Sequence, residues 1–64
     1  MTVRRFPLTF QKACYCLWAV NEMGWSQTET AIVVKLNVGD VSKVINGHRY
    51  TMAFPVPIPG YEAA

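Results

Sequence analysis

Hydrophobic positions repeat with helical spacing in three successive stretches of this chain, and a helix-ending residue follows the first and the last. The first stretch covers residues 8–23. Its apolar positions fall along one broad helical face: Phe10, Ala13, Cys14, Leu17, Val20 and Met23. Thr9 stands where an N-cap belongs, and Gly24 stands where a helix ends. The pattern predicts a helix over residues 8–23 whose apolar face packs into the core.

A second stripe of this helix, at spacing i, i+4, i+7 and i+11, contains Gln11, Tyr15, Trp18 and Glu22. A stripe that faces solvent has no need of Tyr and Trp, whereas both residues are favoured anchors at interfaces. Tyr15 and Trp18 are therefore predicted to form a homodimer contact or a partner site. The alternatives are that the C-terminal tail folds back over them, or that both rings are exposed by chance.

Residues 24–36 contain a second predicted helix, which begins with a capping box. In this box the Ser26 hydroxyl accepts from the Glu29 N–H, and the Glu29 side chain reaches back to the Ser26 N–H. Ala31 and Val34 are expected to face inward. Ala31 is also small enough to let a neighbouring helix cross closely.

Residues 37–46 form the third predicted helix, with Asn37 as the N-cap and Gly47 as the stop. Its buried stripe consists of Val41, Val44 and Ile45. The outward side is short or polar with one long cation, and comprises Val38, Gly39, Ser42, Lys43 and Asn46. Such side chains can approach base edges without steric obstruction.

The two flanks are expected to be extended. Residues 1–7 form an arm because Pro7 disfavours a helical conformation at Phe6. Arg4 and Arg5 in this arm either reach a phosphate or the minor groove, or belong to a solvated terminus. In the tail, three prolines alternate with Val56 and Ile58, which favours polyproline II and packing on the domain. The prolines also allow recognition by a proline-binding module.

The predicted fold is all-α, with three helices in one domain that covers residues 1–64. It consists of an arm (1–7), a helical core (8–50) and an extended tail (51–64). A chain of 64 residues is long enough for a single small domain with a thin core. Yet 52% of it is hydrophobic, so the core is dense or some apolar surface serves a partner.

Formal net charge is only +2, but the charge is unevenly distributed. Residues 1–12 carry +3, residues 13–34 carry −2 and residues 35–50 carry +2. Basic charge therefore flanks a mildly acidic middle, where a DNA-binding domain would meet phosphate, although ordinary surface lysine and arginine give the same pattern.

Several other classes of function find no support in the residues. Cys14 and Cys16 would point roughly 200° apart on a helix, and with His48 as the single histidine a zinc site lacks ligands. No catalytic set, phosphate loop or cofactor motif is present. Neither a signal peptide nor a membrane span of about eighteen apolar residues is evident, so free thiols and a bacterial cytoplasmic location are expected.

The stretch from Ser26 to Arg49 resembles the helix-turn-helix of the lambda-repressor-like and related small regulators of bacteria and phages. The run typical of that family is matched without a gap by Ser26-Gln27, Ala31, Val41, Val44, Asn46-Gly47 and Arg49. The match covers about twenty-four residues. It implies a fold in which the third helix lies in the major groove of double-stranded DNA.

This sequence departs from the family pattern at two places. The turn usually has a glycine four residues after the alanine, where this chain has Lys35, so the turn is expected to be shaped differently. The recognition helix begins with Val38-Gly39-Asp40, where polar base-reading side chains are common. Lambda-repressor-like domains also have further helices after the motif, whereas this chain continues into its proline-rich tail.

The function that follows is a sequence-specific DNA-binding regulator, a repressor or autoregulator of phage or mobile-element type that binds a two-fold operator as a dimer. Base or phosphate contacts are expected from Ser42, Lys43 and Asn46, with Asn37, Val38 and Gly39 at the start of the helix. Phosphate contacts are expected from Gln27 and Thr28 and from His48, Arg49 and Tyr50, with His48 otherwise a solvated loop residue. The alternative is an antiactivator or accessory subunit with this shape that binds a protein and no DNA.

Overall fold

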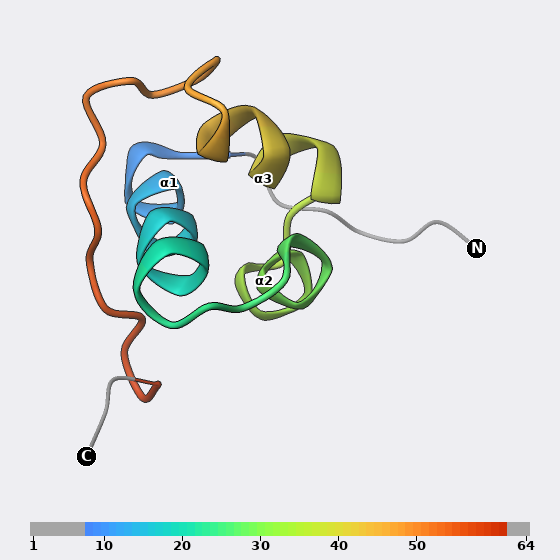
Figure 1. Cartoon of the computed structure of the whole chain (residues 1–64), viewed down its shortest axis with the longest axis vertical. Helices are drawn as coiled ribbons and strands as arrows, with labels where there is room; N and C mark the ends of the chain where they lie inside the picture. The colour runs from blue at the N-terminus through green and yellow to red at the C-terminus, as the bar shows by residue number, and fades with distance from the viewer. Residues whose placement is uncertain (1–7, 62–64) are drawn as a thin grey trace.

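The computed structural model describes residues 8–61, which contain three α-helices. Helix α1 spans Phe10–Leu17 and continues as a π-helical segment, Trp18–Glu22. Helix α2 spans Gln27–Val34, and α3 spans Val38–Ile45. Figure 1 shows α2 and α3 on one side of α1, and the segment after α3 running along its other side. The predicted all-α, three-helix character is confirmed, while the arm over residues 1–7 lies outside the described residues.

The helices begin where the sequence provides caps. The Thr9 hydroxyl accepts from the Lys12 N–H at 3.2 Å, and the Ser26 hydroxyl accepts from the Glu29 N–H at 3.0 Å. Thr30 adds a hydroxyl bond of 2.8 Å to the Ser26 carbonyl. Asn37 has the extended backbone of an N-cap, but its side chain makes no capping bond. Helix α3 is therefore less firmly capped than α1 and α2.

The helices α2 and α3 end in the same way, with a residue of left-handed backbone. After α3, Gly47 has φ +79°, the His48 N–H bonds the Lys43 carbonyl at 2.8 Å and the Gly47 N–H bonds the Val44 carbonyl at 3.1 Å. These two bonds form a Schellman motif. After α2 the left-handed residue is Lys35, at φ 62° and ψ 47°. The expectation of a differently shaped turn is wrong, because Lys35 adopts the backbone that a glycine would supply there.

The core lies where α1 meets α2 and α3, and it is built mainly from small and branched side chains. Its buried members are Ala13, Cys16, Trp18, Ala19, Ala31, Val34, Leu36, Val41, Val44 and Ile58. The inward positions predicted for α2 and α3 are buried at Ala31, Val34, Val41 and Val44, whereas Ile45 is only half-buried at the edge of the core. On α1 the prediction fails at both ends of the stripe, since Phe10 and Met23 are 43% and 41% exposed. Both residues lie at the ends of the long first helix, beyond the reach of α2 and α3.

Trp18 does not face solvent, so its predicted role as an exposed interface anchor is wrong. Its side chain is only 7% exposed and packs edge-to-face on Trp25, with ring centroids 5.9 Å apart. Trp25 in turn packs on Tyr61 at 5.6 Å. The Val56 N–H donates to the Cys14 carbonyl at 3.2 Å, and Ile58 is buried. Residues 56–61 therefore cover the side of α1 that the sequence pattern left outward, which is the alternative of a tail folded back.

Candidate nucleic-acid interface

The loop between α2 and α3 has three residues and brings the two helices into contact. The Leu36 N–H bonds the Ala31 carbonyl at 2.9 Å, and both side chains are buried. This is the long bond of a Schellman motif together with its usual apolar contact, so Leu36 anchors the loop to the core. Since Lys35 beside it has a left-handed backbone, the chain turns sharply, and α3 starts at Val38, three residues after Lys35.

One side of α3 is open to solvent along its whole length. Val38 is 48% exposed, Gly39, Lys43 and Asn46 are exposed, and Ser42 is half-buried. The Asn46 amide donates to the Ser42 hydroxyl at 3.0 Å. This bond, one turn along the helix, orients two polar side chains before any partner arrives. The predicted face of α3 is thus brought together as one surface, with a single cation at its centre.

Asp40, which carries the charge opposite to that needed for phosphate, is half-buried rather than fully exposed on this face. Its carboxylate is near enough to the α1 thiol of Cys16 to influence it electrostatically. Burial raises the pKa of Cys16 to about 11, and Asp40 adds to that rise. The negative charge of Asp40 therefore acts on a thiol at the core side of α3. The Cys16 thiol remains protonated at neutral pH, which makes it a poor nucleophile or metal ligand.

The first turn of α2 supplies a second polar group of residues. Gln27 is half-buried and Thr28 is exposed, directly after the Ser26 cap. Asn37 is exposed at the start of α3. Free N–H groups and the helix dipole favour an anion at such a terminus. Glu29 in the same turn is also exposed and carries the opposite charge to that needed for phosphate.

Beyond α3, the predicted contacts divide into two kinds. His48 and Arg49 are exposed, as a contact with phosphate requires. Tyr50 is half-buried, and its hydroxyl donates to the Leu8 carbonyl at 3.2 Å. The Arg49 guanidinium lies over the Tyr50 ring at 5.5 Å. Tyr50 thus ties the end of α3 to the start of α1 and holds Arg49 in place. Arg4 and Arg5 lie outside the described residues.

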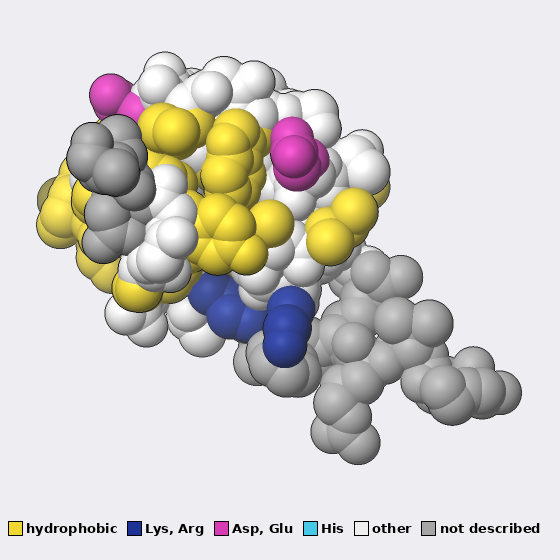
Figure 2. All heavy atoms as spheres, turned by 90° about the horizontal axis from the view of Figure 1, so that it is seen from below, with side chains coloured by type: hydrophobic (Ala, Val, Ile, Leu, Met, Phe, Trp, Pro, Cys, Tyr) yellow, Lys and Arg dark blue, Asp and Glu magenta, His cyan; other side chains and the backbone are white. Residues whose placement is uncertain are grey.

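Tyr15, the other predicted interface residue, is half-buried beside a hollow of about 230 Å³. The hollow lies between α1, α2 and the tail, and its walls are Lys12, Tyr15, Val33, Val34, Lys35 and Ile58. Figure 2 shows hydrophobic side chains gathered on the face seen from below, with basic side chains at one edge. The pKa of Lys12 is lowered, first by its burial and then by the neighbouring charge of Lys35.

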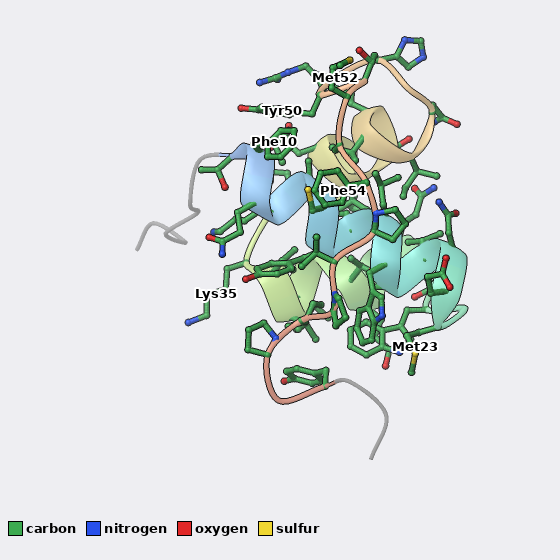
Figure 3. The ribbon with its side chains drawn as sticks, turned by 90° about the vertical axis from the view of Figure 1, so that its left-hand side faces the viewer. Phe10, Met23, Lys35, Tyr50, Met52 and Phe54 are labelled. Atoms are coloured by element: carbon green, nitrogen blue, oxygen red, sulfur yellow. The ribbon has the colours of Figure 1, made fainter. Side chains whose placement is uncertain are left out.

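One cluster on the surface was not predicted. Phe10, Tyr50 and Phe54 pack together, and Met52 lies at the same end of the molecule (Figure 3). The signal available in the sequence was the alternation of large apolar residues at positions 50, 52 and 54. That alternation has no helical period, so the sequence pattern assigned Met52 and Phe54 to the extended tail.

A search of residues 8–61 finds no group of three histidine, cysteine or acidic side chains placed to hold a metal ion. The helices in this range are also too short and too polar for a membrane crossing. Comparison of the chain with protein-family models, curated proteins and solved structures finds no match.

Proposed function

We propose that this protein is a sequence-specific DNA-binding transcription regulator, that α2 and α3 act as a helix-turn-helix, and that it binds a two-fold operator as a dimer. The observation that carries the proposal is the open side of α3, next to a three-residue loop that fixes α3 against α2. A helix with one uncovered polar side, supported from behind by a core, is the form in which proteins enter the major groove.

Base reading falls to the residues in the middle and at the end of α3. The bonded pair of Ser42 and Asn46 offers a hydroxyl and an amide, and an asparagine amide pairs well with the N6 and N7 atoms of adenine. Val38 offers an apolar contact suited to a thymine methyl group. Gly39 contributes no side chain, but it permits close approach of the helix to the groove.

Phosphate contacts fall to the flanking groups. Lys43 and Arg49 are exposed cations at the middle of α3 and just after it. Thr28 and Gln27 present polar groups at the N-terminus of α2, where the dipole favours an anion. These contacts set the register of the protein on the duplex, whereas sequence discrimination comes from the α3 side chains.

The proposal is tested by titrating full-length protein into fluorescein-labelled random-sequence duplex and measuring anisotropy from 50 to 200 mM salt. Lys43→Gln should weaken binding and reduce the slope of log K against log salt by about one, because one phosphate contact is lost. Lys12→Gln is the control, since this lysine comes from α1, lines the hollow and is not part of the open side of α3. Equal slopes for both variants would contradict the placement of α3, provided circular dichroism shows both folded.

Sequence specificity requires a separate measurement, since salt dependence reports only backbone contacts. Selection from a random duplex pool should enrich an inverted repeat whose half-sites lie about one helical turn apart. Asn46→Ala should relax the preference at one base pair per half-site, at a cost of about 1–3 kcal/mol there. Enrichment without any repeat would remove the two-fold part of the proposal.

A second candidate function is a protein-binding antiactivator with the same shape. It is favoured by the modest charge of the α3 surface, where Val38 and Gly39 occupy the start of the helix and Lys43 is the one cation among the five outward residues. Absence of retention on heparin at 50 mM salt, together with no anisotropy change on DNA, would favour this candidate over the first.

A further inference from the structure

One end of the molecule carries an apolar surface, which we call the aromatic cap: Phe10, Tyr50, Met52 and Phe54 (Figure 3). Phe10 comes from the start of α1, and the other three follow α3. Phe10 packs edge-to-face against Tyr50 at 6.2 Å and against Phe54 at 6.1 Å. Three of the four remain widely open to solvent, because Phe10, Phe54 and Met52 are 43%, 58% and 83% exposed.

The backbone beneath the aromatic cap is held by hydrogen bonds. The Ala53 N–H bonds the Tyr50 carbonyl at 2.9 Å, which closes a turn with Met52 at its tip. Tyr50 has a left-handed backbone with φ 53°, and its hydroxyl bonds the Leu8 carbonyl. A left-handed tyrosine costs about 1–2 kcal/mol. The folded chain therefore holds Tyr50 in a strained conformation while Met52 and Phe54 remain exposed to water. The apolar surface is thus already formed in the single chain, before a partner binds.

The exposed part of the cap has a size that matters for a chain this small. A fully exposed large side chain has an accessible surface of about 200 Å². The exposed fractions of Phe10, Phe54 and Met52 therefore correspond to about 370 Å² of exposed apolar surface in total. The described surface totals 4305 Å², so the cap is close to a tenth of it. Exposed apolar patches of 300–600 Å² on monomers are often functional. A contact between two such caps lies below the 1,200 Å² of stable complexes, which indicates a weak association.

We propose that the aromatic cap is where a second copy of this chain docks, in a symmetric contact of cap on cap. The cap is apolar and none of its four side chains carries a charge, so it is complementary to itself, as a two-fold interface must be. Aromatic rings and methionine are also the side chains enriched in the buried centre of interfaces. The contact replaces the predicted one through Tyr15 and Trp18, which the tail partly covers.

The position of the cap suits the proposed dimer on DNA, and this step rests on the proposed function. Three of the four cap residues follow the C-terminal end of α3, and none of the four is an outward residue of α3, so the proposed contact does not use the side chains proposed to read base pairs. One copy is 37 Å long in its longest dimension, so two copies joined at one end are large enough to place their α3 helices about 34 Å apart, one turn of DNA.

The docking surface is tested without DNA by sedimentation equilibrium of the full chain from 10 µM to 1 mM. Wild-type protein should pass from 7.2 kDa toward twice that mass over this range. Met52→Glu should stay near 7.2 kDa, with a dimer dissociation constant raised at least tenfold, because a symmetric contact would bury two carboxylates against apolar surface. Met52 is 83% exposed, so this variant should retain the wild-type fold.

Ile32→Glu is the matched control, because Ile32 is a comparably exposed apolar residue, at 72%, on α2 and outside the cap. It should associate as wild type does. The proposal is overturned if wild-type protein remains monomeric at 1 mM, or if both variants weaken association equally. A monomer that binds DNA in the anisotropy assay would refute the docking surface and the dimer part of the proposed function, and would leave DNA binding itself standing. A Met52-dependent dimer without DNA binding would refute the proposed function alone.

Discussion

The open side of α3 and the tail-covered side of α1 differ in what lies over them. Both belong to short helices with an apolar stripe toward the core. Nothing among residues 8–61 covers the outward side of α3, so Lys43 and Asn46 remain exposed. On the other side of α1 the tail adds Ile58 to the core, and Trp18 is buried against Trp25, which packs in turn on Tyr61. The comparison shows that α1 and the π-helical segment after it, which are packed on two sides, bury more side chains than α3, which is packed on one side.

The strongest test of this contrast is removal of the tail's buried anchor. Ile58→Ala should lower the free energy of unfolding by about 3 kcal/mol, because it deletes buried methyl groups and leaves a cavity at α1. Ile32→Ala makes the same chemical change at a position that is 72% exposed and should cost under about 0.5 kcal/mol. Urea unfolding followed by tryptophan fluorescence measures both. Equal costs would mean that the tail does not contribute to the core.

The buried thiol on the side of α1 that faces α3 should also respond to alkaline pH. Burial raises the pKa of Cys16 from 9.0 to about 11, so the fold favours the neutral thiol. This contribution is complete below pH 9 and is lost between pH 9 and pH 11. A shift of this size corresponds to about 2 kcal/mol at pH 11. Wild-type protein should therefore lose about that much more stability between pH 8 and 11 than Cys16→Ala. Parallel pH profiles would show that the thiol is not enclosed.

A smaller effect is expected at the loop that sets α3. Lys35 has a left-handed backbone that costs a side-chain-bearing residue about 1–2 kcal/mol. Lys35→Gly should remove this strain and, after the entropy of a more flexible unfolded chain, stabilise the protein by about 0.5–1 kcal/mol. Lys35→Ala is the control, since it removes the same side chain and keeps the strain. If both variants are more stable than wild-type protein, the gain in stability comes from loss of the lysine side chain and not from relief of backbone strain.

The helices and their boundaries were predictable because their signals are local. Thr9, Ser26 and Gly47 act within one turn of their own positions, so hydrogen bonds three to five residues apart express them directly. The outward residues of α3 were predictable for a related reason, since no further element packs on that side. Ser42, Lys43 and Asn46 could therefore be chosen as candidates from spacing alone.

The errors lie where a distant segment decides burial. Trp18 was assigned to an exposed stripe, because the helical period cannot show that residues about forty positions later return to cover it. Phe10 and Met23 were assigned to the core, because the period does not show how far along α1 its neighbours extend. Lys35 was expected to reshape the turn, yet the apolar anchor of Leu36 and the hydrogen bond to Ala31 hold it in the left-handed region.

The sequence by itself determined the number of helices, most of their caps, and the polar side that α3 presents. These depend on interactions between residues a few positions apart, whose geometry every helix repeats. Only the tertiary structure decided that the tail closes over α1, and that Phe10, Met52 and Phe54 gather into an exposed cap. The physical reason is that burial is a property of the whole chain. A side chain is buried when segments far apart in the sequence pack around it, and the local spacing of hydrophobic residues carries no information about that packing.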